Sequence, residues 1–413
     1  MSTAYEAASA THAPEVVLGV GAGIAAYKSC ELLRLLTESG YGVRVVPTPD
    51  ALRFVGEATW AALSGRPAAQ EVWDTVHQVE HVRVGQNADL IVVAPATADL
   101  LARAAHGRAD DLLTNTLLTA RCPVLFAPAM HTEMWEHPAT QANVATLRER
   151  GAVVLDPASG RLTGTDTGRG RLPEPEEIHA VSQRLLNRGN LPADLRGCRV
   201  LITAGGTREP IDPVRYLGNH SSGRQGYAFA ETALARGAEV TVVSANVTLP
   251  DPAGATVRRV GSAAELREAV LQERSGADVI VMAAAVADFR PVNSAEGKLK
   301  KDGAQPQPVA LAQNPDILAE ISQDRTHSSQ VVVGFAAETE DVLGNGRSKL
   351  AAKGCDLLVV NRVGEGRAFG TTDNQVAVLS ADGSVADIPL SEKADIADRV
   401  WDSVVERVTN DAS

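Results

Sequence analysis

The sequence has few cysteines, few lysines and no long apolar run, and each shortage excludes a class of protein. Its four cysteines, Cys30, Cys122, Cys198 and Cys355, lack the paired spacing of a zinc site or a disulfide framework. No stretch approaches the roughly 20 apolar residues of a membrane-spanning helix. Residues 1–14 also lack the basic start of a signal peptide. We therefore expect a cytoplasmic protein without a membrane partner.

The charge balance excludes another kind of partner. The chain has 413 residues and a formal net charge of −12, and both halves hold more acidic than basic residues. A nucleic-acid backbone requires a basic protein face, so we expect no nucleic-acid partner. At this length, with 44% hydrophobic residues, the chain can form two core-containing domains of roughly 100–200 residues each.

Lysine is the scarce cation, with 7 Lys against 32 Arg. A lysine retained in such a sequence can mark a need for a compact ammonium group, for example beside a triphosphate. A solvated charged face explains any single lysine equally well. Five of the seven fall at Lys298, Lys300, Lys301, Lys349 and Lys353.

The first half alternates apolar runs with helical spacing, which predicts a doubly wound α/β sheet with its ligand at the carboxyl ends of the strands. The glycines at 19, 21 and 23 do not match G-x-G-x-x-G, and no acid ends the second strand, so a dinucleotide is disfavoured. Strands are expected at 16–20, 43–46, 90–94 and 124–127, with a weaker candidate at 153–155.

The second half opens on a long polar connection between a strand and a helix, residues 202–226. Gly205 and Gly206 let the backbone turn close to a ligand, and Ser221 and Ser222 open a helix whose free N–H groups suit phosphate or carboxylate. A capped surface helix is the plainer interpretation of these features alone. A binding loop is favoured by the accompanying polar cluster of Arg208, Asp212, Arg215, Asn219 and His220.

The rest of the second half again alternates strands and helices, so a second doubly wound, Rossmann-like domain is expected. A Gly-, Asn- and Pro-containing linker lies within residues 185–197 and places the domains at 1–189 and 190–413. Strands are expected at 239–244, 279–282, 331–335 and 357–361, and helices at 263–273, 315–321 and 342–353.

The motif AGGTREPIDPVRYLGNHSSGRQG resembles the signature loop of phosphopantothenate–cysteine ligases. The whole chain resembles the bacterial bifunctional phosphopantothenoylcysteine decarboxylases/phosphopantothenate–cysteine ligases of coenzyme A biosynthesis. This resemblance implies that CTP activates 4'-phosphopantothenate as an acyl-cytidylate, that cysteine then displaces CMP, and that Mg²⁺ arrives with the triphosphate and not in a protein cage.

The same resemblance assigns roles in the second half. It implies that Asn219 polarises the acyl intermediate and that Lys298 offsets charge on the phosphates. Substrate would be bound by Arg215, Ser221 and Ser222. The positions that match CTP contacts are Met282, Ala283, Ala284, Asp288, Lys298, Pro315, Asp316, Ile317, Phe335, Lys349 and Lys353.

The first half resembles the flavodoxin-like, flavin-dependent cysteine decarboxylases. GAGIAAYK, with Gly21 and Gly23, is similar to their FMN-phosphate turn, and Thr48 and Thr97 match flavin-contacting positions. His81 matches their active-site histidine, although a lone histidine is more often structural. Their substrate clamp is matched by PAMHTEMW, which contains Met130, His131 and Met134.

Two departures from the decarboxylase pattern affect the chemistry. His131 stands where the family usually has Asn, so a ring nitrogen would replace an amide beside the substrate carboxylate. Gly164 stands where the family's flap usually carries a proton-donating Cys. The resemblance implies that FMN oxidises the cysteine thiol to a thioaldehyde, which makes loss of CO₂ easy. Thr163 or Thr165 could relay the later proton through water, but a hydroxyl is a far weaker acid than a thiol.

Relatives of the first half form trimers and relatives of the second half form dimers. A chain that keeps both contacts must close as a homo-oligomer with threefold and twofold axes, a hexamer or a dodecamer, of which we expect the dodecamer. Two other interpretations stay open: a flavoprotein that retains only one of the two activities, and a nucleotide-binding scaffold without catalysis.

Overall fold

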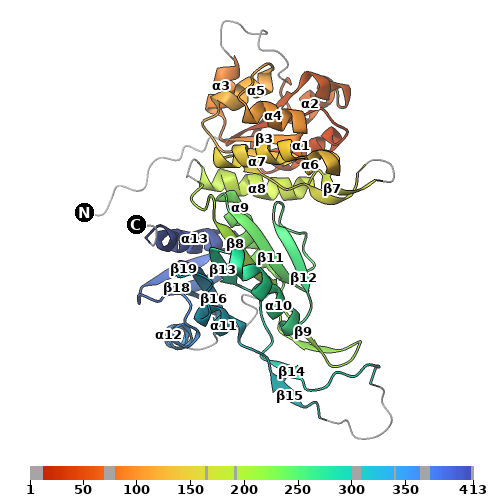
Figure 1. Ribbon diagram of the computed structural model, residues 1–413. Helices are drawn as coiled ribbons and strands as arrows, with labels where there is room; N and C mark the ends of the chain where they lie inside the picture. Colours follow the sequence, from red (N-terminus) through yellow and green to blue (C-terminus); the bar gives the residue numbers. More distant parts are fainter. Residues whose placement is uncertain are drawn as a thin grey trace, which may run out of the picture. The chain divides into compact units, whose positions relative to one another are not determined.

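The computed structural model describes residues 13–68, 80–162, 166–189, 193–299, 308–338, 341–362 and 373–410. The chain divides into two compact units, Met1–Ala193 and Asp194–Ser413, and each is described by itself (Figure 1). Within the described ranges, no helix has the length and apolar character needed to cross a membrane. Thr163, Gly164, Thr165, Lys300 and Lys301 lie outside these ranges.

The first unit is built on a five-stranded parallel sheet in the order β2-β1-β3-β4-β5. Its strands are β1 (Glu15–Val20), β2 (Gly42–Pro47), β3 (Leu90–Ala96), β4 (Val124–Pro128) and β5 (Val153–Val154). Every residue of β3 is buried, as expected for a strand covered on both faces. The order is that of flavodoxin-like folds, in which the topology reverses between β1 and β3 and leaves a crevice at their carboxyl ends.

Helices cover both faces of this sheet, and a hairpin lies beside its carboxyl edge. The core under one face includes Val17, Val93, Leu100, Phe126 and Val144. The helices are α1 (Ala26–Glu38), η1 (Pro49–Arg53), α2 (Glu57–Ser64), α3 (Glu80–Asn87), α4 (Ala98–Ala105), α5 (Leu112–Thr119), α6 (Thr132–Trp135), α7 (Pro138–Glu149) and α8 (Pro175–Arg188). The hairpin is formed by β6 (Ala158–Arg161) and β7 (Thr167–Arg171).

The second unit contains an eight-stranded sheet in the order β12-β11-β8-β13-β16-β17-β18-β19. The strands are β8 (Arg199–Gly205), β11 (Glu239–Ala245), β12 (Thr256–Val260), β13 (Val279–Met282), β16 (Val331–Glu338), β17 (Leu357–Arg362), β18 (Asp373–Ser380) and β19 (Val385–Glu392). The first six run parallel and follow the Rossmann order 3-2-1-4-5-6, so the switch point lies between β8 and β13. The last two pair antiparallel.

Two groups of helices sandwich this second sheet, as Figure 1 shows. On one face lie α9 (Arg224–Ala235) and α13 (Lys393–Asn410), whose Phe229 and Trp401 pack edge to face in the core. On the other face, Leu266, Ile321 and Leu350 come from three further helices. These are α10 (Ala263–Glu273), followed by η2 (Arg274–Gly276), then α11 (Ile317–Gln323) and α12 (Val342–Lys353).

Two short antiparallel ribbons project from the second sheet. They are β9 (Arg208–Pro210) with β10 (Tyr216–Gly218), and β14 (Phe289–Pro291) with β15 (Leu311–Gln313). The sequence predicted β9 and β10 as loop, because three-residue strands give no usable periodicity. The long polar connection is therefore an ordered ribbon followed by a helix start.

Candidate active sites

At the carboxyl edge of the first sheet, backbone hydrogen bonds join the loops that follow β1, β2 and β3. Gly21 N–H donates to the Pro95 carbonyl (3.0 Å), and Thr48 N–H donates to the Val20 carbonyl (2.9 Å). Thr97 caps α4, where its hydroxyl accepts from Leu100 N–H (3.2 Å). The fold thus brings Gly21, Thr48 and Thr97 together at the β1/β3 switch point.

The groups at this edge suit a flavin phosphate and ring. Thr48 is buried, and its Oγ1 has no hydrogen-bond partner within the described residues. A buried hydroxyl without a partner is costly, so a bound ligand that hydrogen-bonds to it would be stabilised. Only glycine fits at position 21, because a Cβ there would collide with the Pro95 carbonyl oxygen. A Cβ on Gly23 would meet nothing within 4 Å, so the turn leaves open space there.

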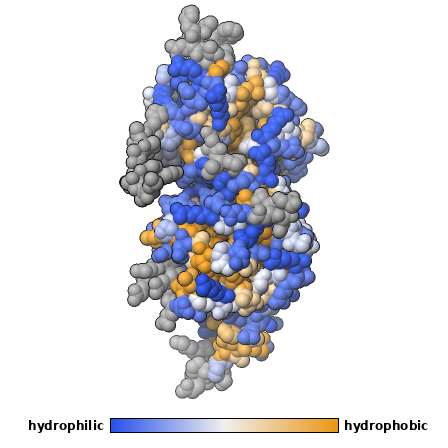
Figure 2. Space-filling model, turned by 90° about the vertical axis from the view of Figure 1, so that its left-hand side faces the viewer, coloured by the Kyte–Doolittle hydropathy of each residue, from blue (hydrophilic) through white to orange (hydrophobic). Residues whose placement is uncertain are grey.

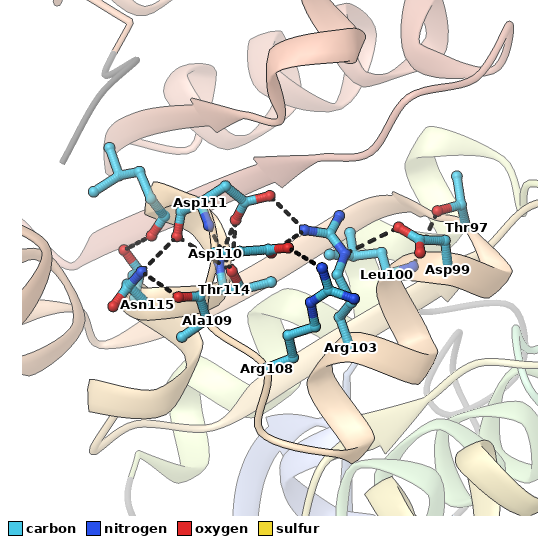
Figure 3. A network of polar contacts seen from close by, with 12 residues as sticks. Thr97, Asp99, Leu100, Arg103, Arg108, Ala109, Asp110, Asp111, Thr114 and Asn115 are labelled. Carbon is cyan, nitrogen blue, oxygen red and sulfur yellow. Dashed lines mark hydrogen bonds and ion pairs between the residues drawn. The ribbon is translucent and has the colours of Figure 1, made fainter.

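A polar network holds the start of α4 in place (Figure 3). The Arg103 guanidinium bonds to Asp99 (2.9 Å), Asp110 (2.9 Å) and Asp111 (2.7 Å). Asp111 in turn caps α5 by accepting from Thr114 N–H (2.8 Å). The network therefore ties α4, whose N-cap residue is Thr97, to the start of α5.

The segment expected to clamp substrate lies against the β6–β7 hairpin. Met130 N–H donates to the Gly170 carbonyl (2.9 Å), and a Cβ on Gly170 would collide with the Met130 carbonyl oxygen. His131 precedes α6 as its N-cap residue, and the Met134 side chain is half exposed. His81 lies at the start of α3, but its side chain is outside the described part of the structure.

The second unit has a cavity of about 900 Å³ at the carboxyl edge of its sheet, over the β8/β13 switch point. That volume lies near the upper end of the range for small-molecule sites. Most of the positions that were matched to CTP or substrate line it: Asn219, Ser221, Ser222, Met282, Ala283, Ala284, Asp288, Pro315, Asp316, Ile317, Phe335, Lys349 and Lys353.

Buried threonines hold the loop that follows β13 from below. Thr203 Oγ1 accepts from Ala284 N–H (3.1 Å), and Thr207 Oγ1 accepts from Ala287 N–H (2.9 Å). Both threonines are 0% exposed. Asn314 Nδ2 donates to the Ala287 carbonyl (2.7 Å). These bonds fix the 283–288 backbone along the cavity wall.

Acidic partners hold the two lysines of α12. Lys349 pairs with Glu338 (2.6 Å), and Lys353 pairs with Asp316. Asp316 also caps α11 by accepting from Ala319 N–H (3.1 Å). The four-residue spacing therefore places both ammonium groups on the α11/α12 side of the cavity.

The structure places two of the expected residues elsewhere. Arg215 and Lys298 are not among the residues that line the cavity. The Arg215 guanidinium pairs with Asp212 (Nη2 to Oδ2, 2.5 Å) and donates to the Leu299 carbonyl (3.0 Å). Arg215 and the segment that carries Lys298 thus lie beside each other, outside the lining of this cavity.

The sequence interpretation missed several lining residues on the other side of the cavity: Arg224, Gln225, Asn361, Asn374 and Lys393. Lys393 was detectable through the scarcity of lysine. Its burial was not, because it depends on β18 and β19 returning to the edge of the sheet. No cluster of three or more metal-binding side chains occurs in the described ranges.

Two family models cover the chain. The model described as Flavoprotein matches residues 4–187, and that of the DNA/pantothenate metabolism flavoprotein C-terminal domain matches residues 195–408. The Coenzyme A biosynthesis bifunctional protein CoaBC of Mycolicibacterium smegmatis is 58% identical over 399 residues, or 94% of this chain and 96% of that protein. The chain belongs to the CoaBC family.

Membership of the CoaBC family confirms the expected function and fold. The protein acts in coenzyme A biosynthesis and combines a flavoprotein decarboxylase with a phosphopantothenate–cysteine ligase on two Rossmann-like α/β units. Two solved structures each cover about half of the chain. The C-terminal domain of CoaBC is 35% identical (53% of this chain, 99% of that chain, TM-score 0.45). The FMN-dependent cysteine decarboxylase SpaF is 31% identical (42% and 96%, TM-score 0.38).

Proposed function

We propose that the second unit activates 4'-phosphopantothenate with CTP and couples it to cysteine, and that the first unit, with FMN, decarboxylates the product to 4'-phosphopantetheine. The observation that carries this proposal is the convergence of Asn219, Asp288, Phe335 and Lys349 on one cavity. These residues come from four separate segments between positions 219 and 349. The volume of about 900 Å³ suits a nucleotide together with a second small reactant.

In the ligase step, the backbone of residues 283–288 lies against the nucleotide, and Lys349 and Lys353 offset the triphosphate charge. The Asn219 side chain donates to the Val286 carbonyl (3.0 Å), so its amide is held at the wall of this loop. From that position it would polarise the acyl-cytidylate while the cysteine amine displaces CMP. Ser221 and Ser222 stand before α9, where an anionic group is stabilised.

In the decarboxylase step, bound FMN would accept the two electrons released when the substrate thiol is oxidised to a thioaldehyde, whose C=S group can take up the electron pair left on the substrate when CO₂ departs. Gly21, Gly23, Thr48 and Thr97 would hold the cofactor. Met130, His131 and Met134 would clamp the substrate, with the His131 ring beside its carboxylate. His81 would act as the active-site histidine.

Mg²⁺ enters the ligase step with CTP. The ion prefers phosphate oxygens and water to protein cages. Removal of Mg²⁺ with a chelator should therefore stop CMP release and leave decarboxylation of preformed phosphopantothenoylcysteine unchanged.

A second copy of the chain would complete the ligase site and form the dimer contact of the expected oligomer. Its docking surface is an exposed apolar patch on and beside the two ribbons, formed by Val214, Tyr216, Phe289, Val292, Leu299 and Leu311. Apolar surface gathers at the level of β14 and β15 in Figure 2. Exposed patches of this kind mark protein contacts. Arg215 and Lys298 border the patch, so they would reach a cavity across the twofold axis.

The test incubates the full chain with 4'-phosphopantothenate, cysteine, CTP, Mg²⁺ and FMN, and measures CMP and CO₂. We expect stoichiometric release of both. If CMP is released without CO₂, only the ligase half of the proposal stands. If CO₂ is released only when phosphopantothenoylcysteine is added, only the decarboxylase half stands. Release of neither from a folded, FMN-containing preparation would refute both.

A further inference from the structure

The ligase cavity carries cationic residues from both faces of its sheet. Lys349 and Lys353 belong to α12, which packs on the face occupied by α10 and α11. Arg224 and Lys393 begin α9 and α13, which pack on the opposite face. All four side chains line the same cavity. The two pairs therefore approach the carboxyl edge of the sheet from opposite sides.

Lys393 is unusual because it is buried, with 7% of the residue exposed. Burial lowers the pKa of its ammonium group, and the positive charge of Arg224 lowers that pKa further, while Asp373 raises it. Lysine is almost never buried unless its charge is paired, and Lys393 has protein partners of its own. Because Arg224 and Lys393 both line the cavity, an anion bound between them would be attracted by both positive charges.

The surroundings of Lys393 suit a polar anion. The Gln225 side chain donates to the Lys393 carbonyl (3.0 Å), which ties the start of α13 to the start of α9. Asn361 of β17 and Asn374 of β18 also line the cavity.

The proposed ligase reaction brings two phosphorylated reactants together, the triphosphate of CTP and the phosphate monoester of 4'-phosphopantothenate. The α12 pair lies beside the residues matched to CTP. We propose that Arg224 and Lys393 form a second anion subsite that binds a phosphoryl group of a substrate, separate from the Lys349 and Lys353 subsite. This inference rests on the proposed ligase function and extends it to two residues outside the matched positions.

Steady-state ligase kinetics on the full chain test the subsite, with Lys393→Met as the variant that removes the charge and Lys393→Arg as the variant that keeps it. Arg399→Met is the matched control, because Arg399 is exposed on the same helix and is not among the lining residues. Thermal unfolding checks that each variant folds, and decarboxylation of preformed phosphopantothenoylcysteine checks the first unit.

We expect Lys393→Met to raise the KM of one phosphorylated substrate by roughly tenfold to a hundredfold, as for the loss of a charge-assisted hydrogen bond. Lys393→Arg should bring that KM most of the way back to the parent value, and Arg399→Met should have the same KM values as the parent protein. A raised KM for 4'-phosphopantothenate, with reduced discrimination against unphosphorylated pantothenate, assigns the subsite to the phosphate monoester. A raised KM for CTP alone assigns it to the nucleotide.

Unchanged KM values for both substrates in a folded Lys393→Met protein would overturn the inference while leaving the ligase function intact. A fall in kcat alone, equal in Lys393→Met and Lys393→Arg, would also overturn it, since it would indicate a packing role. Absence of ligase activity in the parent protein would instead refute the proposed function.

Discussion

Asp212 and Leu299 are joined across the ribbon region of the ligase unit, because the Asp212 carboxylate accepts from the Leu299 N–H (3.1 Å). The same carboxylate pairs with Arg215 and accepts from the backbone N–H groups of Val214 and Arg215 (2.8 Å each). The Asp212 side chain is fully buried. One carboxylate therefore positions both Arg215 and the segment that contains Lys298.

Asp212→Asn should slow the ligase and leave the decarboxylase unchanged. An amide cannot replace the ion pair with Arg215, so the two segments would separate. Steady-state CMP release and CO₂ release from preformed phosphopantothenoylcysteine measure the two activities. A variant that loses both equally would indicate general unfolding in place of a local effect.

The stabilising effect of Asp212 should depend on pH in a defined direction. Its bond to Arg215 holds the pKa of this carboxyl well below its usual range, near 3.9 in model peptides. A group whose pKa is lower in the folded state adds stability above the unfolded pKa and loses it as pH falls through the folded pKa. The parent should thus exceed Asp212→Asn in unfolding free energy by the largest amount at pH 7. This difference should shrink as the pH falls below about 4.

Thr48→Val should weaken FMN binding without destabilising the protein that lacks FMN. The Thr48 hydroxyl is buried without a partner among the described residues, so an apolar side chain of the same shape is neutral or favourable there. We expect roughly a five- to tenfold rise in the Kd for FMN, measured by flavin fluorescence, with recovery in Thr48→Ser. A lower unfolding temperature of the FMN-free variant would contradict this assignment.

Thr207→Val should impair CTP binding, because it leaves the buried Ala287 N–H without its acceptor. Such a loss costs about 1–3 kcal/mol and should loosen the 283–288 loop. The expected result is a KM for CTP raised about tenfold, with Thr207→Ser close to the parent. Equal kinetics for Thr207→Val and the parent would show that the loop is held by its other contacts.

Arg103→Met should destabilise the decarboxylase unit. The change leaves Asp99, Asp110 and Asp111 without their shared cation, at a cost of about 1–3 kcal/mol. Arg108→Met is the control, since Arg108 is 70% exposed and pairs with Asp110 (3.0 Å) at the surface, where a pair contributes less than about 1 kcal/mol. Denaturant unfolding followed by flavin release measures both, and equal midpoints would refute the role of the network.

Replacing all four cysteines should leave decarboxylation nearly intact. Cys122 lies before β4, at the amino edge of the sheet and opposite the expected flavin edge, and burial raises its pKa to about 11. Cys30 lies in α1, where burial raises the pKa of its thiol, and Cys198 and Cys355 belong to the ligase unit. Turnover of phosphopantothenoylcysteine by the cysteine-free chain measures this, and abolished turnover would identify one of these thiols as the proton donor.

The sequence predicted those elements whose signal is local. The apolar run Val279–Met282 is the strand β13, and the helical spacing of residues 342–353 gives α12 with the predicted bounds. The run after β11 was missed, because β12 has the sequence TVRRV, is only partly buried and carries two arginines. The strand β19 is mostly exposed and gives no apolar alternation. Both depend on pairing with distant strands.

The residues of the candidate sites likewise divide into those that a local motif predicted and those whose position depends on distant parts of the chain. Loop motifs at strand ends, such as that of Asn219, gave residues that line the cavity, because parallel strands place their following loops along one edge. Lys393 could not be found this way, since it follows an antiparallel strand. Arg215 and Lys298 were assigned to the ligase site by motif, but they are not among the residues that line the cavity.

The cavity residues of the ligase extend from Gly218 to Lys393 along the chain, and the closing strand β19 comes just before the last helix. During synthesis, the flavin unit can therefore fold while the ribosome is still translating the rest, because domains generally fold as units. The ligase cavity lacks part of its lining until residue 393 has emerged. A stalled or truncated polypeptide would then bind flavin yet be unable to make the amide on which its own decarboxylation depends.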